Sequence, residues 1–193
     1  MTIRAFIFDF DGTIVASNGV KRSGFFFVSQ GIEGAAEKLR RLLAEPDPGD
    51  RYDIFRKLGA DHELLVEAYG RYCEREILAL LKTTPVAPLL EGLKRRGYAL
   101  FIASATPQLD LVAMMAKSPL AQVFDEIHGR PRSKTEIIDD ICQRRGYSPH
   151  EVVMVGDDAP DARAAEEYGC RFIAVGENPD CLAAVTEFLQ GHG

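Results

Sequence analysis

The feature that most constrains this chain is an apolar segment near its start that ends in two carboxylates. Residues 3–15 read IRAFIFDFDGTIV, so that a strand-like run of apolar and aromatic residues leads to Asp9 and Asp11. A dry protein interior does not tolerate unpaired carboxylates, because they lose their hydration there. The two aspartates must therefore be compensated by other groups, or their charge must have a use.

The C-terminal part of the chain alternates between strand-like and helix-like segments. From residue 86 onward, near-continuous apolar stretches are separated by segments of helical periodicity. This alternation is typical of βαβ units and predicts an α/β fold with a parallel sheet covered by helices on both faces. The expected strands are residues 3–10, 98–104, 123–129, 151–158 and 170–176. The expected helices of this part are residues 107–117, 134–145, 160–168 and 180–189.

Residues 16–84 break this pattern, because they contain no convincing strand. Helical periodicity appears near residues 18–30, 33–44, 51–58 and 61–82. We interpret the segment as a helical insert placed directly after the first strand. The sequence therefore predicts a discontinuous α/β domain of residues 1–14 and 85–193, with a small helical domain of residues 15–84.

Composition and charge limit the classes of partner that we expect for this chain. The 193-residue chain has a net charge of −6, which gives no reason to expect nucleic acid or an anionic membrane surface as a partner. Its four cysteines form no C-x-x-C pair, and no histidine lies at zinc-finger spacing. Arg4 and Asp9 interrupt the first apolar run, so we expect no signal peptide and a soluble, cytoplasmic protein.

Polar residues follow several of the expected strands. In open parallel sheets, ligands bind beyond the carboxyl ends of the strands. Asp9 and Asp11 end the first strand of this chain. The other polar residues expected at this edge are Ser104, Lys134, Asp157, Asp158 and Asp161. We therefore expect one serine, one lysine and several carboxylates to meet at one edge of the sheet.

This combination of residues suits a magnesium-dependent phosphate site. Clustered carboxylates repel one another unless a cation joins them, and oxygen ligands favour a hard cation such as Mg²⁺. A lysine ammonium and a serine hydroxyl can hold phosphate oxygens. In the D-x-D spacing, alternate residues point the same way, so Asp9 can attack while Asp11 handles the proton. Gly12 allows the backbone to turn sharply next to a ligand.

Four motifs in order resemble those of the haloacid dehalogenase (HAD) superfamily. DFDGT is similar to its first motif, D-x-D-G-T, and LFIASAT is similar to its second, an apolar strand ending in serine or threonine. Lys134 in GRPRSKTEII matches the lysine of the third motif, and VMVGDDAPD matches the fourth, G-D-x-x-x-D. The resemblance implies a Rossmann-like core with a C1-type cap, as in the phosphoglycolate phosphatase and β-phosphoglucomutase branch.

The resemblance also implies a reaction. Asp9 would be the nucleophile that forms an aspartyl-phosphate, and Asp11 would protonate the leaving group and then activate water. Mg²⁺ would be held by the Asp9 carboxylate, the Asp11 main-chain carbonyl and Asp157. The expected activity is Mg²⁺-dependent hydrolysis of a small phosphorylated metabolite, such as a sugar phosphate or a phosphorylated organic acid. Whether Asp158 or Asp161 contacts the metal stays open, with Asp161 favoured outside the direct ligands.

The remaining expected roles concern the phosphoryl group and the substrate. By the same resemblance, Ser104 would hydrogen-bond the phosphoryl group, together with main-chain N–H groups near Gly12 and Ala105. Lys134 would neutralise charge on Asp9 and on the phosphate. In the insert, Arg51 follows a turn at an expected helix start and is the candidate for contact with an anionic substrate.

Three alternatives stay open on these residues. A β-phosphoglucomutase-like phosphotransferase would use the same core residues. A haloacid dehalogenase needs no metal, and Asp11 and Asp157 count against it. A non-catalytic phosphate-binding regulatory module, such as a receiver-like domain, also pairs acidic residues with serine or threonine and lysine. In receivers, however, the phosphorylated aspartate follows the third strand, and no large insert follows the first.

Overall fold

The computed structural model describes residues 2–46, 48–59, 62–176 and 180–191 of the chain. The predicted domains also include residues 1, 47, 60–61, 177–179 and 192–193, which lie outside the described residues. The chain divides into two compact units. The first comprises Met1–Ala16 with Leu80–Gly193, and the second comprises Ser17–Ala79.

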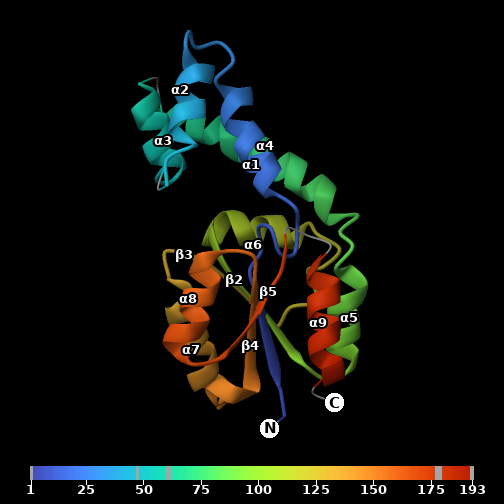
Figure 1. Ribbon diagram of the computed structural model, residues 1–193. Coiled ribbons are helices and arrows are strands. Elements are labelled where there is room, and N and C mark those ends of the chain that lie inside the picture. The colour runs from blue at the N-terminus through green and yellow to red at the C-terminus, as the bar shows by residue number, and fades with distance from the viewer. Residues whose placement is uncertain (1, 47, 60–61, 177–179, 192–193) are drawn as a thin grey trace. The chain divides into compact units, whose positions relative to one another are not determined.

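The first unit is built on a five-stranded sheet (Figure 1). The strands are β1 (Ala5–Phe8), β2 (Ala99–Pro107), β3 (Glu126–Arg130), β4 (Val152–Gly156) and β5 (Arg171–Ala174). Their order is β3-β2-β1-β4-β5, and every neighbouring pair is parallel. The predicted α/β fold with a parallel sheet is therefore confirmed.

The strand order reverses at β1. β2 and β3 lie on one side of it, whereas β4 and β5 lie on the other. Such a reversal opens a crevice beyond the carboxyl ends of the central strands. Asp9 directly follows β1, and Asp157 directly follows its neighbour β4. The topology thus brings the two carboxylates to the same crevice.

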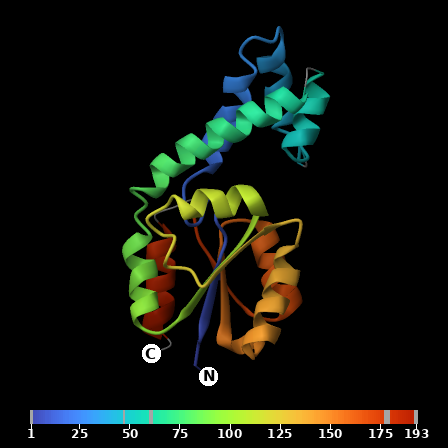
Figure 2. The same cartoon turned by 180° about the vertical axis from the view of Figure 1, so that it is seen from behind.

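Helices cover both faces of this sheet. They are α5 (Ala87–Arg95), α6 (Gln108–Ala116), α7 (Lys134–Arg145), α8 (Ala159–Tyr168) and α9 (Asp180–Gly191), with a short 3₁₀ helix at Pro149–Glu151. α7 and α8 cover one face, and α5 and α9 cover the opposite face (Figures 1 and 2). In both views α6 lies at the end of the sheet where the strands terminate.

The core follows the alternation of side chains along the strands. Ile7 of β1 and Phe101 of β2 are fully buried and pack in one cluster with Ile138 of α7. The alternate residues point to the other face, where the Phe6 ring meets the edge of Phe188 of α9 at a centroid distance of 6.4 Å. Because both faces are covered, the strands can be apolar at every position.

β3 begins later than the sequence predicts, at Glu126 rather than at residue 123. The cause is Asp125. Its backbone N–H donates to the Leu100 carbonyl at 2.8 Å, while its carboxylate accepts from the Leu100 N–H at 2.8 Å. A side chain thus takes the place of one backbone partner next to β2. Lys94 also donates to this carboxylate at 2.6 Å.

The end of α7 is fastened to the start of β3 by Glu126. Arg144 donates to the Glu126 carboxylate at 2.6 Å, and Arg145 donates to it at 2.7 Å. These hydrogen bonds, those from Arg144 foremost, lower the pKa of Glu126 from 4.5 to about 2. The charged form of Glu126 is therefore the one that stabilises the fold.

The second unit is helical in its described residues. It contains α1 (Asn18–Val28), α2 (Ala35–Leu42), α3 (Arg51–Leu58) and most of α4 (His62–Leu81). Its core is aromatic: the Phe25 ring lies 4.5 Å from the Tyr69 ring and 5.2 Å from the Phe55 ring, centroid to centroid. A Cβ at Gly24 would lie only 3.0 Å from Tyr69, so the close approach of α1 to α4 depends on glycine.

Among the described residues, no helix combines the length and the apolar character that crossing a membrane requires.

Glu126→Gln tests the fastening of α7. We expect the substitution to lower the free energy of unfolding at pH 7 by about 1–2 kcal/mol, because it removes a charged partner of two arginines. Since the folded-state pKa of Glu126 is lowered, its stabilisation is present above pH 4.5 and is lost as the pH falls toward 2. Denaturant unfolding of both proteins across this pH range measures the difference.

Glu91→Gln is the matched control. Glu91 pairs with Arg95 on the surface of α5, with 55% of its side chain exposed and an N–O distance of 3.7 Å. We expect a loss below about 0.5 kcal/mol there. Equal losses in the two variants, or a Glu126→Gln deficit that does not shrink in acid, would contradict the role of Glu126.

Candidate active site

Asp9 occupies the position directly after β1 and is 4% exposed. Its backbone N–H donates to the Val155 carbonyl of β4 at 2.9 Å, which continues the ladder between the two strands for one more residue. Its carboxylate lies 3.1 Å from the Lys134 Nζ. The buried charge of Asp9 therefore has a cation as its partner.

A tight turn follows Asp9 and brings the next residues back toward β4. Gly12 has φ 82°, a conformation that favours glycine, and its N–H donates to the Val15 carbonyl at 2.8 Å. Thr13 is fully buried in this turn, and its hydroxyl donates to the Asp157 carboxylate at 3.2 Å. The turn thus joins the loop after β1 to the loop after β4. Thr13 was not among the residues predicted to act in the site.

The end of β2 faces the same turn. Ser104 is 1% exposed, and its Oγ accepts a hydrogen bond from the Thr106 N–H at 3.1 Å. The Thr106 hydroxyl donates to the Asp11 carboxylate at 2.8 Å. Ala105, between them, is exposed. The structure thus links Asp11 to Thr106, a residue to which the sequence analysis gave no role. No sequence pattern singles out Thr106, because its place depends on how β2 pairs with β3.

Lys134 reaches the site from the first turn of α7. Ser133 caps this helix, since its side chain accepts from the Glu136 N–H and its own N–H donates to the Glu136 side chain. The Lys134 Nζ lies 2.5 Å from Asp161 and 3.9 Å from Asp158, in addition to its contact with Asp9. The ammonium is therefore surrounded by three carboxylates.

Asp161 is fully buried in the first turn of α8. Asp158 caps this helix and accepts from the Asp161 N–H at 3.2 Å. A Cβ at Gly156 would lie 2.3 Å from the Asp161 carboxyl carbon, so only glycine leaves room for this side chain. Gly156, the glycine of the VMVGDDAPD motif, is thus required for a steric reason that the sequence alone did not reveal.

Three carboxylates form a group that fits a hard cation. One carboxylate oxygen from each of Asp9, Asp157 and Asp161 lies within 4.8 Å of the other two. An all-oxygen, all-carboxylate donor set suits Mg²⁺. Asp9 and Asp157 were predicted as ligands, together with the Asp11 carbonyl, whereas Asp161 was expected outside the direct ligands. The geometry adds Asp161 to the candidate set.

Burial and charge repulsion both shape this cluster. Burial raises the pKa of Asp9 to about 7, with Lys134 opposing and the Asp11 charge adding to the rise. Burial also raises the pKa of Asp161 to about 8. Burial by itself lowers the pKa of Lys134, but the charges of Asp9 and Asp161 outweigh it and raise the pKa. The raised pKa values indicate that Lys134 alone does not offset the burial of these carboxylates, and a bound cation would favour their charged forms.

Arg51 belongs to the other compact unit, where it begins α3. Asp50 caps that helix, and the Arg51 guanidinium lies 5.4 Å from the centre of the Tyr52 ring. Its contact with a substrate stays a prediction.

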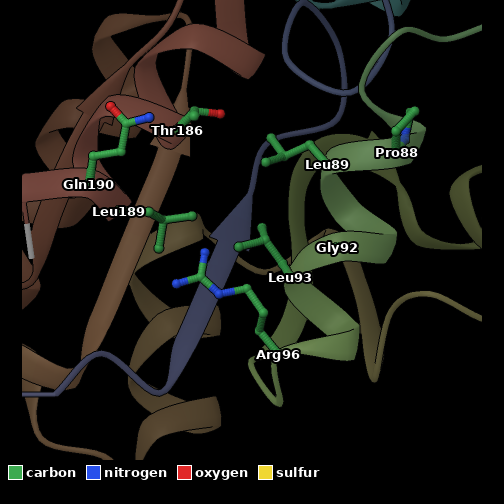
Figure 3. A pocket seen from close by; sticks show the side chains of 8 residues that line it. All are labelled: Pro88, Leu89, Gly92, Leu93, Arg96, Thr186, Leu189 and Gln190. Atoms are coloured by element: carbon green, nitrogen blue, oxygen red, sulfur yellow. The ribbon is translucent and has the colours of Figure 1, made fainter. Parts of the chain in front are cut away.

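A separate hollow of about 380 Å³ lies between α5 and α9 (Figure 3). Its lining residues are Pro88, Leu89, Gly92, Leu93, Arg96, Thr186, Leu189 and Gln190. Figure 3 shows that Arg96 is its charged side chain. These lining residues include no carboxylate, so the hollow offers nothing to a magnesium ion. The candidate active site is the cluster of carboxylates and Lys134 at the ends of β1, β2 and β4.

A family model described as haloacid dehalogenase-like hydrolase matches residues 6–175. A phosphoglycolate phosphatase of Synechococcus elongatus is 28% identical over 180 residues, which cover 90% of this chain and 84% of the relative. This match agrees with the predicted branch of the family.

Solved structures share the fold. YfnB of Bacillus subtilis, described as a HAD-hydrolase and solved with bound magnesium, has a TM-score of 0.77 at 15% identity and covers 98% of this chain and 100% of its own. A Thermotoga maritima protein described as a β-phosphoglucomutase has a TM-score of 0.72 at 22% identity, with coverage of 94% and 91%.

Gly156→Ala tests whether the Asp161 side chain needs the space that a glycine leaves at residue 156. The added methyl would meet the Asp161 carboxyl group at 2.3 Å, so we expect the side chain to be displaced. The expected results are a loss of about 1–3 kcal/mol in the free energy of unfolding and weaker Mg²⁺ binding, because overpacking is costly and one candidate ligand moves. Denaturant unfolding and titration calorimetry with MgCl₂ measure the two effects.

Gly92→Ala is the control, because the nearest atom to its added Cβ is 3.9 Å away in the middle of α5. Unchanged or slightly higher stability is expected there, since alanine favours a helix. A Gly156→Ala protein that matched the parent in stability and Mg²⁺ affinity would contradict the steric argument.

Proposed function

Since the chain belongs to the haloacid dehalogenase-like hydrolase family, we propose that it is a Mg²⁺-dependent phosphatase that hydrolyses a small phosphate monoester. The observation that carries the proposal is the buried cluster in which Lys134 lies 3.1 Å from Asp9, beside carboxylates that can share a divalent cation. The proposed nucleophile, its lysine partner and the carboxylates that could bind a metal ion thus lie next to one another.

In the first half of the proposed reaction, Asp9 is the nucleophile. One of its carboxylate oxygens attacks phosphorus, and the bond from phosphorus to the leaving oxygen breaks. The leaving oxygen takes a proton from the Asp11 carboxyl group. The products of this half are an acyl phosphate on Asp9, the released alcohol and an Asp11 carboxylate.

In the second half, water attacks the phosphorus of the acyl phosphate. Asp11 accepts a proton from this water, and the bond between phosphorus and the Asp9 oxygen breaks. Inorganic phosphate leaves, and both aspartates return to their starting forms. Asp11 therefore serves as acid and then as base, which requires it to stay close to the reacting oxygen in both halves.

The other residues stabilise the charge that moves during these steps. Lys134 supplies a fixed positive charge next to the attacked phosphoryl group, while Ser104 and the N–H groups near Gly12 and Ala105 donate to its oxygens. The Asp9 and Asp157 carboxylates and the Asp11 carbonyl would hold Mg²⁺, with Asp161 as a further candidate. When bound, Mg²⁺ would offset the repulsion between Asp9 and the substrate phosphate.

For the substrate, we propose a small phosphorylated metabolite, such as a sugar phosphate or a phosphorylated organic acid. The named activity of the Synechococcus elongatus relative supports this class. In this proposal the helical unit Ser17–Ala79 acts as a cap that selects the leaving group, and Arg51 contacts an anionic part of the substrate.

Asp9→Asn provides the first test. We expect phosphate release from an aryl phosphate and from a panel of phosphorylated metabolites, and we expect EDTA to abolish it. The substitution should lower kcat by at least about 1,000-fold, because a carboxamide cannot form the acyl phosphate. A phosphate-release assay with and without Mg²⁺ measures these effects.

Asp139→Asn is the matched control, because it neutralises an exposed carboxylate on α7 that accepts a hydrogen bond from Gln143 and is no part of the candidate site. Its activity should therefore stay close to that of the parent. Phosphate release that survives Asp9→Asn would exclude Asp9 as the nucleophile. Conversion of a sugar monophosphate into an isomer without net phosphate release would favour the phosphotransferase instead.

A further inference from the structure

We propose that Thr106 is a positioning residue that holds Asp11 in the orientation its acid and base role requires. This inference rests on the proposed function. The Thr106 hydroxyl donates to Oδ2 of Asp11 at 2.8 Å, and Thr106 itself is 8% exposed. A hydrogen bond from a buried side chain fixes its acceptor more firmly than one from an exposed side chain does.

A local irregularity in the sheet brings Thr106 to this place. β2 and β3 pair at Ala103 with His128 and again at Pro107 with Arg130. Four steps along β2 therefore correspond to two steps along β3, so Ser104, Ala105 and Thr106 bulge out of the ladder. Bulges re-aim side chains next to active sites. Here the bulge turns the Thr106 hydroxyl toward the residue that follows β1.

The bulge is held against β3 by two further residues. A Cβ at Gly129 would lie 2.4 Å from the Thr106 carbonyl oxygen, so the backbone of Thr106 approaches β3 as closely as a glycine allows. The Gln108 side chain donates to the Ile127 carbonyl at 3.0 Å and accepts from the Gly129 N–H at 2.5 Å. These contacts hold the Thr106 backbone in place, so its hydroxyl can keep the Asp11 carboxylate in a defined orientation.

The contact distinguishes the two oxygens of Asp11. Because Oδ2 accepts the hydrogen bond from the Thr106 hydroxyl, rotation of the carboxyl group is restricted, and its two oxygens keep their places in both halves of the proposed reaction. Oδ2 can accept from Thr106 in both protonation states of the carboxyl group. The same hydrogen bond therefore persists while Asp11 alternates between acid and base.

Thr106→Val and Thr106→Ser test this role through the leaving group. Valine keeps the shape and removes the hydroxyl, whereas serine keeps the hydroxyl. For an alkyl phosphate, whose leaving oxygen needs a proton, we expect Thr106→Val to lower kcat about 10- to 100-fold. For p-nitrophenyl phosphate, which leaves without a proton, the fall should be at most about threefold. Serine should restore most of the alkyl phosphate activity.

The Asp11→Asn background provides a second kinetic test. If Thr106 acts through Asp11, adding Thr106→Val to Asp11→Asn should cause no further fall in kcat on either substrate. A purely structural effect of Thr106→Val would lower kcat equally on both substrates, and this loss would add to the loss caused by Asp11→Asn. Equal losses on both substrates, or additive losses in the double variant, would overturn the proposal.

A crystal structure of Thr106→Val tests the positioning without any assay of activity. We expect the Asp11 carboxylate to take a different or a mixed orientation in the valine variant, and to keep the parent orientation in Thr106→Ser. An unchanged Asp11 in the valine variant would overturn the inference even if the parent enzyme is an active phosphatase. A parent without phosphatase activity would overturn the proposed function, while the orientation of Asp11 would still decide whether Thr106 positions it.

Discussion

The candidate active site depends on one ion cluster, the Lys134 ammonium between Asp9 and Asp161. Neither carboxylate could remain charged in a dry interior by itself, and both have raised pKa values despite the lysine. The lysine is held at 3.1 Å from one carboxylate and 2.5 Å from the other, so it joins the end of β1 to the starts of α7 and α8. The same contact that completes the fold at this edge also supplies charges that the proposed phosphoryl transfer would use.

Strand order explains why these groups meet. Because β1 lies between β2 and β4, loops from three separate parts of the chain end beside one another. Hydrogen bonds then join those loops directly: Thr13 to Asp157 across one side of β1, and Thr106 to Asp11 across the other. The loop after β1 is therefore held from both sides, which would position Asp9 and Asp11 for the proposed reaction before a substrate binds.

Much of this arrangement was predictable from the sequence, because strands and their polar ends have local signals. Asp9, Asp11 and Lys134 were recognised from sequence motifs, and they lie at the edge of the parallel sheet where they were expected. Residues whose importance depends on tertiary contact did not stand out: the place of Thr106 comes from a mismatch between two strands, and the need for Gly156 comes from a side chain five residues later. The substrate contact proposed for Arg51 stays a prediction, because this residue belongs to the other compact unit.

α7 is attached at both of its ends, by Lys134 in the active site and by Arg144 and Arg145 on Glu126. Each residue of a helix turns the chain by about 100° and advances it by about 1.5 Å. The 12 residues of α7 therefore fix how its two ends are rotated relative to each other, as well as the distance between them. An insertion or deletion of a single residue anywhere in α7 would point one end away from its partner, so substitutions can accumulate on its exposed side while its residue count cannot change.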